Sequence, residues 1–120
     1  MLTNASTADR APVILHTTTP DAWAQAQRIG QYTASSLLSE GFIHCSMPTQ
    51  MADTANRHYA GQHGLILLHI DPTKLTAPLR YEPANNQYYP HIYGAINLDA
   101  VTGTSAYEPD AAGTFQAPIL

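Results

Sequence analysis

Six histidines are the most prominent chemical feature of this 120-residue sequence. They occupy positions His16, His44, His58, His63, His69 and His91. Histidine is the side chain most often used for proton transfer and metal ligation near neutral pH. The settings of His58, His63 and His69 favour ordinary surface or core roles, because they fall on a helical face, in a loop and at the end of an apolar run. The other three are candidates for a site.

His16 and His44 occupy equivalent settings, each near the end of a β-rich run and shortly before an expected helix. The first run is "PVILH" (residues 12–16) and the second is "GFIHCS" (residues 41–46). If these strands are neighbours, both imidazoles face one cleft beside helix N-termini, which favour anions. The alternatives are that His44 simply hydrogen-bonds a backbone carbonyl at its strand end, and that two histidines occur at strand ends by chance.

Alternation along the second run separates its side chains into two faces. Ile43 and Cys45 share one face and are expected to pack inward. Phe42, His44 and Ser46 share the other face. Cys45 therefore points away from His44, which argues against a cysteine nucleophile activated by that imidazole. His44 and Ser46 remain as a polar pair next to a helix start.

His91 lies in an aromatic motif, "YYPHIYG" (residues 88–94), with Tyr88, Tyr89 and Tyr93 around it. Aromatic rings near a histidine can form a stacking wall for a planar ligand. The alternative is an aromatic edge that covers the core. Both interpretations stay open on the sequence.

Two glutamates are candidates to assist these histidines. Glu40 precedes the second run, and Glu82 follows "LRY" in a further expected strand. Either carboxylate can orient an imidazole or stabilise a developing cation. Asp21 and Asp71 are interpreted as helix caps instead, because each adjoins a proline at an expected helix start.

A metal site is a further alternative for His16, His44 and His91. Nothing in their spacing requires it, because no HExxH, CxxC or histidine-rich tract is present. Glycine-rich phosphate loops of the Walker or GxGxxG type are also absent from the sequence.

Composition excludes several classes of partner. Nine acidic and five basic residues give a net charge of −4, and the sequence has no cluster of Lys and Arg. DNA and anionic membranes are therefore unexpected partners. A single cysteine rules out an intramolecular disulfide and agrees with a reducing compartment. With no signal-peptide core and no run of roughly 18 apolar residues, a cytoplasmic protein is expected.

Two helices are expected in the first half of the chain. Thr19 can cap the first, Pro20 suits its first turn, and Gly30 can close it. Its buried stripe is expected to consist of Trp23, Ala26 and Ile29. A second helix is expected from Pro48 to Gly61, with Met51, Ala55 and Tyr59 on one face.

Strands dominate the second half. The apolar run 64–71 predicts a strand covered on both faces, and 77–82 and 95–107 predict further strands. This order indicates an α+β fold with a mixed or antiparallel sheet. The expected organisation is a flexible N-terminal tail (1–11), a single α+β domain (12–106) and a C-terminal tail (107–120).

Four segments, in this order and spacing, resemble the bacterial domain-of-unknown-function family numbered 952. They are "ILHTTTPDAW", "SLLSEGFIHCS", "LILLHIDPTKL" with "RYE", and "YPHIYGAINLDAV". The likeness extends from about Val13 to Val101. The fold of that family is similar to that of ADP-ribosyltransferases, the NAD-using group that includes RNA 2′-phosphotransferases. The resemblance implies an ADP-ribosyltransferase-like split sheet, mixed or antiparallel, with two main helices.

The resemblance also implies roles for the histidines. In such folds a histidine of the first strand binds the ribose of NAD, and a residue of the following strand helps to hold the nicotinamide or ribose. His16 and His44 fall at matching places. A third position, usually a glutamate, stabilises the ribosyl cation as nicotinamide leaves. Here "PHIYG" offers His91 and no glutamate, and Glu82 is the carboxylate available to substitute.

Three functions follow as hypotheses. The first is an ADP-ribosyl- or phosphotransferase-type enzyme with NAD as cofactor, and the second is a non-catalytic module for NAD, ADP-ribose or a similar nucleotide-like metabolite. The third is a three-histidine, metal-dependent hydrolase. The expected catalytic residues are His16, His44, His91 and Glu82. The expected ligand-binding residues are Ser46, Tyr89, Tyr93 and Glu40. The oligomeric state stays open.

Overall fold

The structure is a computed structural model that describes residues 12–120. Its helices are α1 (Pro20–Ile29), α2 (Ser35–Glu40) and α3 (Met51–His58). Its strands are β1 (Ile14–Thr18), β2 (Gln31–Tyr32), β3 (Ile43–His44), β4 (Leu65–Ile70), β5 (Leu79–Ala84), β6 (Gln87–Ile92), β7 (Ile96–Asn97) and β8 (Val101–Tyr107). The tail expected at 1–11 lies outside the described residues.

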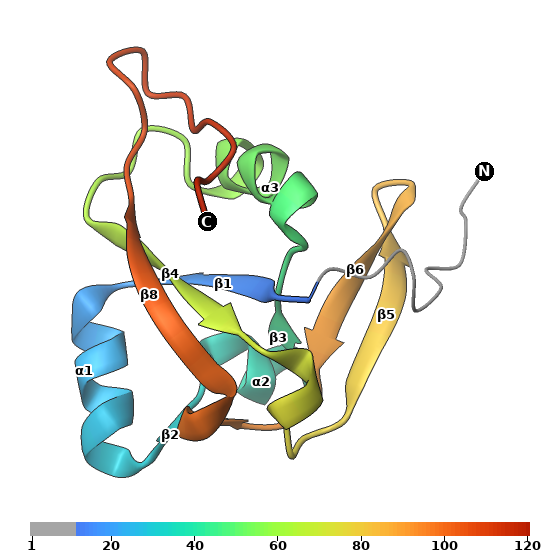
Figure 1. Cartoon of the computed structure of the whole chain (residues 1–120). Coiled ribbons are helices and arrows are strands. Elements are labelled where there is room, and N and C mark those ends of the chain that lie inside the picture. The colour runs from blue at the N-terminus through green and yellow to red at the C-terminus, as the bar shows by residue number, and fades with distance from the viewer. Residues whose placement is uncertain (1–11) are drawn as a thin grey trace.

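An antiparallel sheet in the order β1-β4-β8 forms the centre of the fold (Figure 1). β1 pairs with β4 along its whole length, from Ile14 opposite Ile70 to Thr18 opposite Ile66. β4 is the middle strand, and Leu65, Leu67, Leu68 and Ile70 are buried on its two faces, with Ile66 partly buried. The strand expected at 64–71 and its two-sided burial are confirmed.

A second antiparallel sheet has the order β3-β6-β5, and β2 pairs with β7. The β5–β6 hairpin turns at Asn85 and Asn86, whose φ angles are 47° and 63°. Asparagine tolerates this left-handed conformation better than most residues. β3 contains only Ile43–His44, so the strand expected at 41–46 is shorter than predicted. It pairs with β6, a strand that the sequence did not predict.

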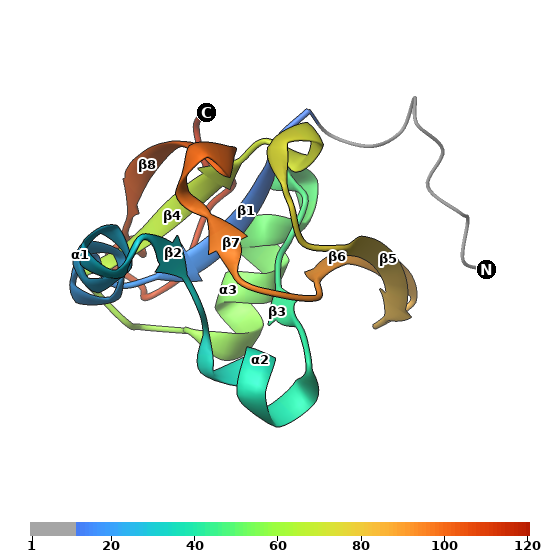
Figure 2. The same cartoon turned by 90° about the horizontal axis from the view of Figure 1, so that it is seen from below.

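The two larger sheets meet at Leu15 and Ser46, which exchange two backbone hydrogen bonds of 2.8 Å. Figure 2 shows the resulting layout: α1 and the β5–β6 hairpin lie at opposite sides, with β1, β3 and α3 between them. The strand pairings are all antiparallel among the described residues. The expected α+β class with antiparallel strands is confirmed.

Helix α1 begins and ends where its sequence predicts. The Thr19 hydroxyl accepts a hydrogen bond from the Ala22 amide, Pro20 occupies the first turn, and Gly30 closes the helix in a left-handed conformation. The cap expected at Asp21 is wrong, because Thr19 caps α1 and Asp21 lies in its first turn, whereas Asp71 caps the 3₁₀ turn Pro72–Lys74 as expected. The predicted buried stripe is wrong at its end, because Ile29 is 64% exposed.

Of the two remaining helices, α3 follows the prediction from the sequence and α2 does not. In α3, Met51 and Ala55 are buried and Tyr59 packs against the same cluster, as expected. α2 lies in a segment that was expected to be a polar connection with at most one irregular turn. Its N-cap, Ala34, makes no side-chain cap, and its Leu38 is 96% exposed, so neither a cap nor an apolar stripe marks it.

The C-terminal segment is part of the folded unit. Phe115 is 1% exposed and its ring packs 4.9 Å from that of Tyr107. The amide side chain of Asn56 on α3 exchanges two hydrogen bonds with the Phe115 backbone. The tail expected at 107–120 therefore begins inside β8 and continues as a packed segment. In residues 12–120, no helix has the length and apolar character to cross a bilayer.

Candidate ligand-binding site

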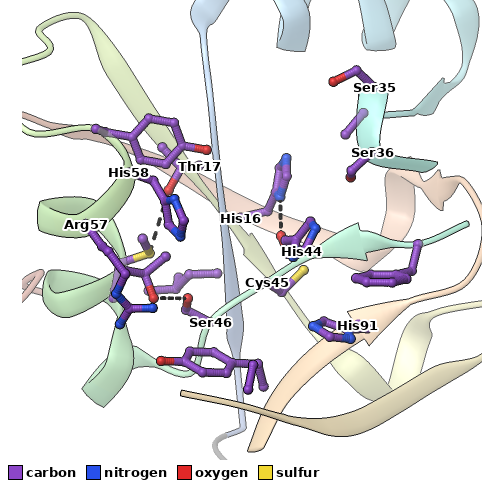
Figure 3. A pocket seen from close by; sticks show the side chains of 18 of the residues that line it. His16, Thr17, Ser35, Ser36, His44, Cys45, Ser46, Arg57, His58 and His91 are labelled. Atoms are coloured by element: carbon purple, nitrogen blue, oxygen red, sulfur yellow. Dashed lines mark hydrogen bonds between the residues drawn. The ribbon is translucent and has the colours of Figure 1, made fainter. Parts of the chain in front are cut away.

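A cavity of about 740 Å³ opens between the two larger sheets. β1, β3 and β6 supply its walls together with α2 and α3 (Figure 3). Its polar lining residues are His16, Thr17, Tyr32, Thr33, Ser35, Ser36, His44, Ser46, Thr54, Arg57, His58, Tyr59, Asn85, Tyr89 and His91. No Asp or Glu lines it within the described part of the chain. We call this space the histidine cavity.

His16 lies on the floor of the histidine cavity as a neutral ring. Its Nδ1 donates a hydrogen bond of 2.6 Å to the backbone carbonyl of His44, and its Nε2 is 2.8 Å from the Tyr32 hydroxyl. That hydroxyl also hydrogen-bonds Thr18 at 2.9 Å. Burial lowers the pKa of His16 to about 4, because a charged imidazole would lose its hydration there. Both ring nitrogens are therefore engaged at neutral pH.

His44 and His91 stand opposite each other on the paired strands β3 and β6. Their ring centroids are 5.4 Å apart. The Phe42 ring stacks on His91 at 4.1 Å and tilts against His44 at 4.8 Å, so it packs against both imidazoles. Both histidines line the same wall, with Arg57 across the hollow (Figure 3). The face shared by Phe42 and His44 was expected from strand alternation and is confirmed.

Each of these imidazoles has its own carboxylate partner. Nε2 of His44 lies 3.0 Å from Oε2 of Glu40, and Nδ1 of His91 lies 2.8 Å from Oε1 of Glu82. Tyr93 donates a hydrogen bond of 2.6 Å to the same Glu82 oxygen. The hydrogen bonds from Tyr93 and then His91 lower the pKa of Glu82, which keeps this carboxylate ionised. Glu40, Glu82 and Tyr93 thus lie behind the lining residues rather than among them.

Arg57, with Tyr89 beside it, forms the part of the lining best suited to bind an anion. Arg57 projects from α3 and forms an ion pair with Asp53 one turn earlier. The phenol of Tyr89 and then Asp53 raise the pKa of Arg57. Yet the Tyr89 hydroxyl is buried and makes no hydrogen bond of good geometry with any described residue. The group beside this hydroxyl is the Arg57 guanidinium, which approaches it without the alignment of a full hydrogen bond.

Ser46 and Cys45 have contrasting environments. Ser46 is 2% exposed and its hydroxyl donates a 3.0 Å hydrogen bond to the Thr54 hydroxyl. Burial raises the pKa of the Cys45 thiol, so this sulfur stays protonated and is a poor nucleophile. The inward direction expected for Cys45 is confirmed by its 5% exposure.

The three-histidine metal alternative is wrong. Within residues 12–120 no group of three His, Cys, Asp or Glu side chains is placed to hold a metal ion. The physical reason lies in His16, whose two ring nitrogens both take part in hydrogen bonds and leave no free lone pair for coordination.

Several lining residues were not predicted from the sequence. Tyr32, Arg57 and the serines of α2 carry no local motif, and each reaches the cavity only because distant segments fold together. The contact of Tyr32 with His16 spans 16 residues of sequence. Helical spacing places Arg57 two positions after Ala55, away from the buried stripe, which is the one local hint that it faces outward.

Fold and cavity together define a small α+β protein with a histidine-lined hollow between antiparallel sheets. The family model described as "Protein of unknown function (DUF952)" matches residues 17–104, and the chain belongs to this family. The family expected from the four sequence segments is confirmed.

Solved structures with the same fold come from a bacterium. The crystal structure of protein CC0527 from Caulobacter crescentus is 28% identical, has a TM-score of 0.79, and covers 87% of this chain and 93% of that chain. The solution NMR structure of CC0527 is 28% identical, with a TM-score of 0.76 and coverage of 88% and 93%. These structures lend no support to the expected likeness to ADP-ribosyltransferases. No curated protein matches the sequence.

Proposed function

We propose that this protein binds a nucleotide-like anion, of the NAD or ADP-ribose kind, in the histidine cavity. The observation that carries the proposal is the Arg57 guanidinium, which lies on a cavity lining that has no carboxylate among the described residues and is held by the Tyr89 phenol and by Asp53. A phosphate oxygen would accept a charge-assisted hydrogen bond from Arg57.

The size and lining of the cavity suit such a ligand. Its volume of about 740 Å³ falls within the range of roughly 300–1,000 Å³ found for small-molecule pockets. Aromatic rings of Phe42, Tyr59 and Tyr89 offer stacking surfaces for a planar base. Hydroxyls of Ser35 and Ser36, on the side of the cavity away from Arg57, offer partners for a ribose (Figure 3). The lack of lining carboxylates avoids repulsion of phosphate.

Transfer of an ADP-ribosyl or phosphoryl group, in an ADP-ribosyltransferase-like fold, is the second candidate. It is favoured by the Glu82–His91 hydrogen bond of 2.8 Å, which brings an ionised carboxylate directly behind a lining residue. Cleavage of the nicotinamide bond develops positive charge on the ribose, and a carboxylate lowers that barrier. Because Glu82 lies outside the lining, simple binding fits the geometry better.

Calorimetric titration tests the proposal, with NAD, ADP-ribose and nicotinamide as separate ligands. We expect NAD and ADP-ribose to bind, and Arg57→Leu to weaken them by about tenfold or more, since a charge-assisted hydrogen bond contributes about 1.5–3 kcal/mol. Arg28→Leu, on the last turn of α1, is the matched control and should leave affinity unchanged. Absence of binding, or equal loss in both variants, contradicts the proposal. Free nicotinamide released from bound NAD would establish transfer or hydrolysis in addition.

A further inference from the structure

We propose that His44 and His91 form an acid–base pair that hydrolyses a small nucleoside phosphodiester held in the histidine cavity. The inference rests on the proposed nucleotide binding and adds to it a reaction and a substrate class. His44 and His91 are register partners with ring centroids 5.4 Å apart, and both line the cavity. Two imidazoles at this separation can serve the entering and the leaving oxygen of one phosphorus.

Each ring is arranged so that one nitrogen is held and the other is free. Glu40 holds Nε2 of His44, and Glu82 holds Nδ1 of His91. Neither the Nδ1 of His44 nor the Nε2 of His91 has a hydrogen-bond partner within the described residues. A carboxylate on one nitrogen fixes the tautomer and orients the ring, which leaves the other nitrogen ready to take or give a proton. Phe42 packs against both rings and limits their rotation.

The roles of the two imidazoles differ by their surroundings. His91 is 9% exposed at its side chain, and its Nδ1 lies 2.8 Å from the Glu82 carboxylate, so a carboxylate stands beside the ring that gives a proton to the leaving group. His44 is 52% exposed at its side chain and can reach water. We assign the general base to His44 and the general acid to His91.

The reaction balances with water as the only co-reactant. Nδ1 of His44 takes a proton from water as the water oxygen bonds to phosphorus. Nε2 of protonated His91 gives its proton to the ribose oxygen as the bond between that oxygen and phosphorus breaks. The product is a phosphomonoester with a free hydroxyl, and solvent restores the two protonation states. Arg57, on the same cavity, offsets the charge on the phosphoryl oxygens.

The nucleophile is water because the side chains nearby are unsuited to attack. The Cys45 thiol is held protonated by burial, and the Ser46 hydroxyl donates to Thr54 rather than to a base.

The chain also contains a histidine–glutamate pair outside the cavity, which serves as a control. Nδ1 of His63 lies 2.8 Å from Glu108 at an exposed site outside the lining of the cavity.

The test follows conversion of 2′,3′-cyclic AMP to AMP monoester by phosphorus NMR, with the full chain and a chelator present. We expect turnover by the native protein and by His63→Gln, and a loss of about 100-fold or more in His44→Gln and in His91→Gln, the contribution of one general acid or base. His44 is half exposed, so its replacement leaves the fold intact and keeps the test decisive if His91→Gln fails to fold.

Calorimetry with the same cyclic nucleotide separates the two proposals. Binding without turnover overturns the acid–base pair and leaves the binding function standing. Turnover that survives in His44→Gln also overturns it. If neither cyclic AMP, NAD nor ADP-ribose binds, both proposals fall.

Discussion

The ring of His16 holds the backbone of His44. Nδ1 of His16 donates a 2.6 Å hydrogen bond to the His44 carbonyl, while the His44 side chain turns toward the cavity and Glu40. One histidine therefore fixes the strand that presents another. Since Nε2 of His16 is occupied by Tyr32, the structure gives His16 a positioning role toward β3. The ribose contact implied by the family resemblance stays a prediction.

Acid should destabilise the protein through His16. Its folded pKa of about 4 lies below the ordinary value of 6.5, so between these values the unfolded chain binds a proton that the folded chain does not. The free energy of unfolding is therefore highest above pH 6.5 and falls by about 3 kcal/mol as the pH is lowered to 4. Urea unfolding at a series of pH values measures this slope.

The control for this slope is His16→Gln, which cannot titrate in that range. Its stability is expected to be lower at pH 7 but nearly flat between pH 6.5 and 4. Carboxylates with lowered pKa, such as Glu82 and Glu108, add acid sensitivity mainly below this window. If the free energy of unfolding of His16→Gln falls with pH as steeply as that of the native protein, another group is responsible for the slope.

Removing the Tyr89 hydroxyl should have opposite effects on stability and binding. In Tyr89→Phe the buried hydroxyl without a good partner disappears, so the free energy of unfolding should rise by about 1 kcal/mol. ADP-ribose affinity should fall, because Arg57 loses a group that orients its guanidinium. Thermal unfolding and calorimetry on the same preparation measure both.

Tyr107→Phe supplies the matched comparison, since the Tyr107 hydroxyl donates a 2.7 Å hydrogen bond to the Gln116 carbonyl. This variant should unfold at a lower temperature and bind ADP-ribose as the native protein does. If Tyr89→Phe is also less stable than native, the hydroxyl has a partner in the free protein and the argument from an unpaired group fails.

The C-terminal segment should contribute strongly to stability. Phe115→Ala empties a fully buried position against Tyr107 and α3, and should lower the free energy of unfolding by about 3–5 kcal/mol. Ile119→Ala, at a side chain 96% exposed, should change it little. If both variants change the free energy of unfolding only slightly in urea, residues 107–120 contribute little to stability and the prediction is wrong.

The parts of the fold that sequence predicts are those set by neighbours in the chain. Thr19, Pro20 and Gly30 act within one turn of α1, so its bounds follow from residue types alone. The apolar run of β4 likewise predicts a strand without information from the rest of the chain. α2 has no such local mark, and Phe115 lies in a Pro- and Ala-containing stretch whose burial depends on contacts with Asn56 and Tyr107.

The site divides in the same way. Residue type identified His16, His44 and His91, and alternation placed His44 beside Phe42. The pairing of His44 with His91 depends on the register of β3 and β6, which joins segments 47 residues apart. Arg57 and Tyr32 reach the cavity by tertiary packing alone. No pattern along the chain contains that information.

The most direct test of the central claim is an amide chemical-shift titration of the ¹⁵N-labelled protein with ADP-ribose. Binding in the histidine cavity predicts saturable shifts on β3, β6 and the α3 residues around Arg57, with β8 and its neighbour Glu108 unaffected. Shifts that are absent at millimolar ligand, or confined to surfaces away from His44, Arg57 and Tyr89, would contradict the account.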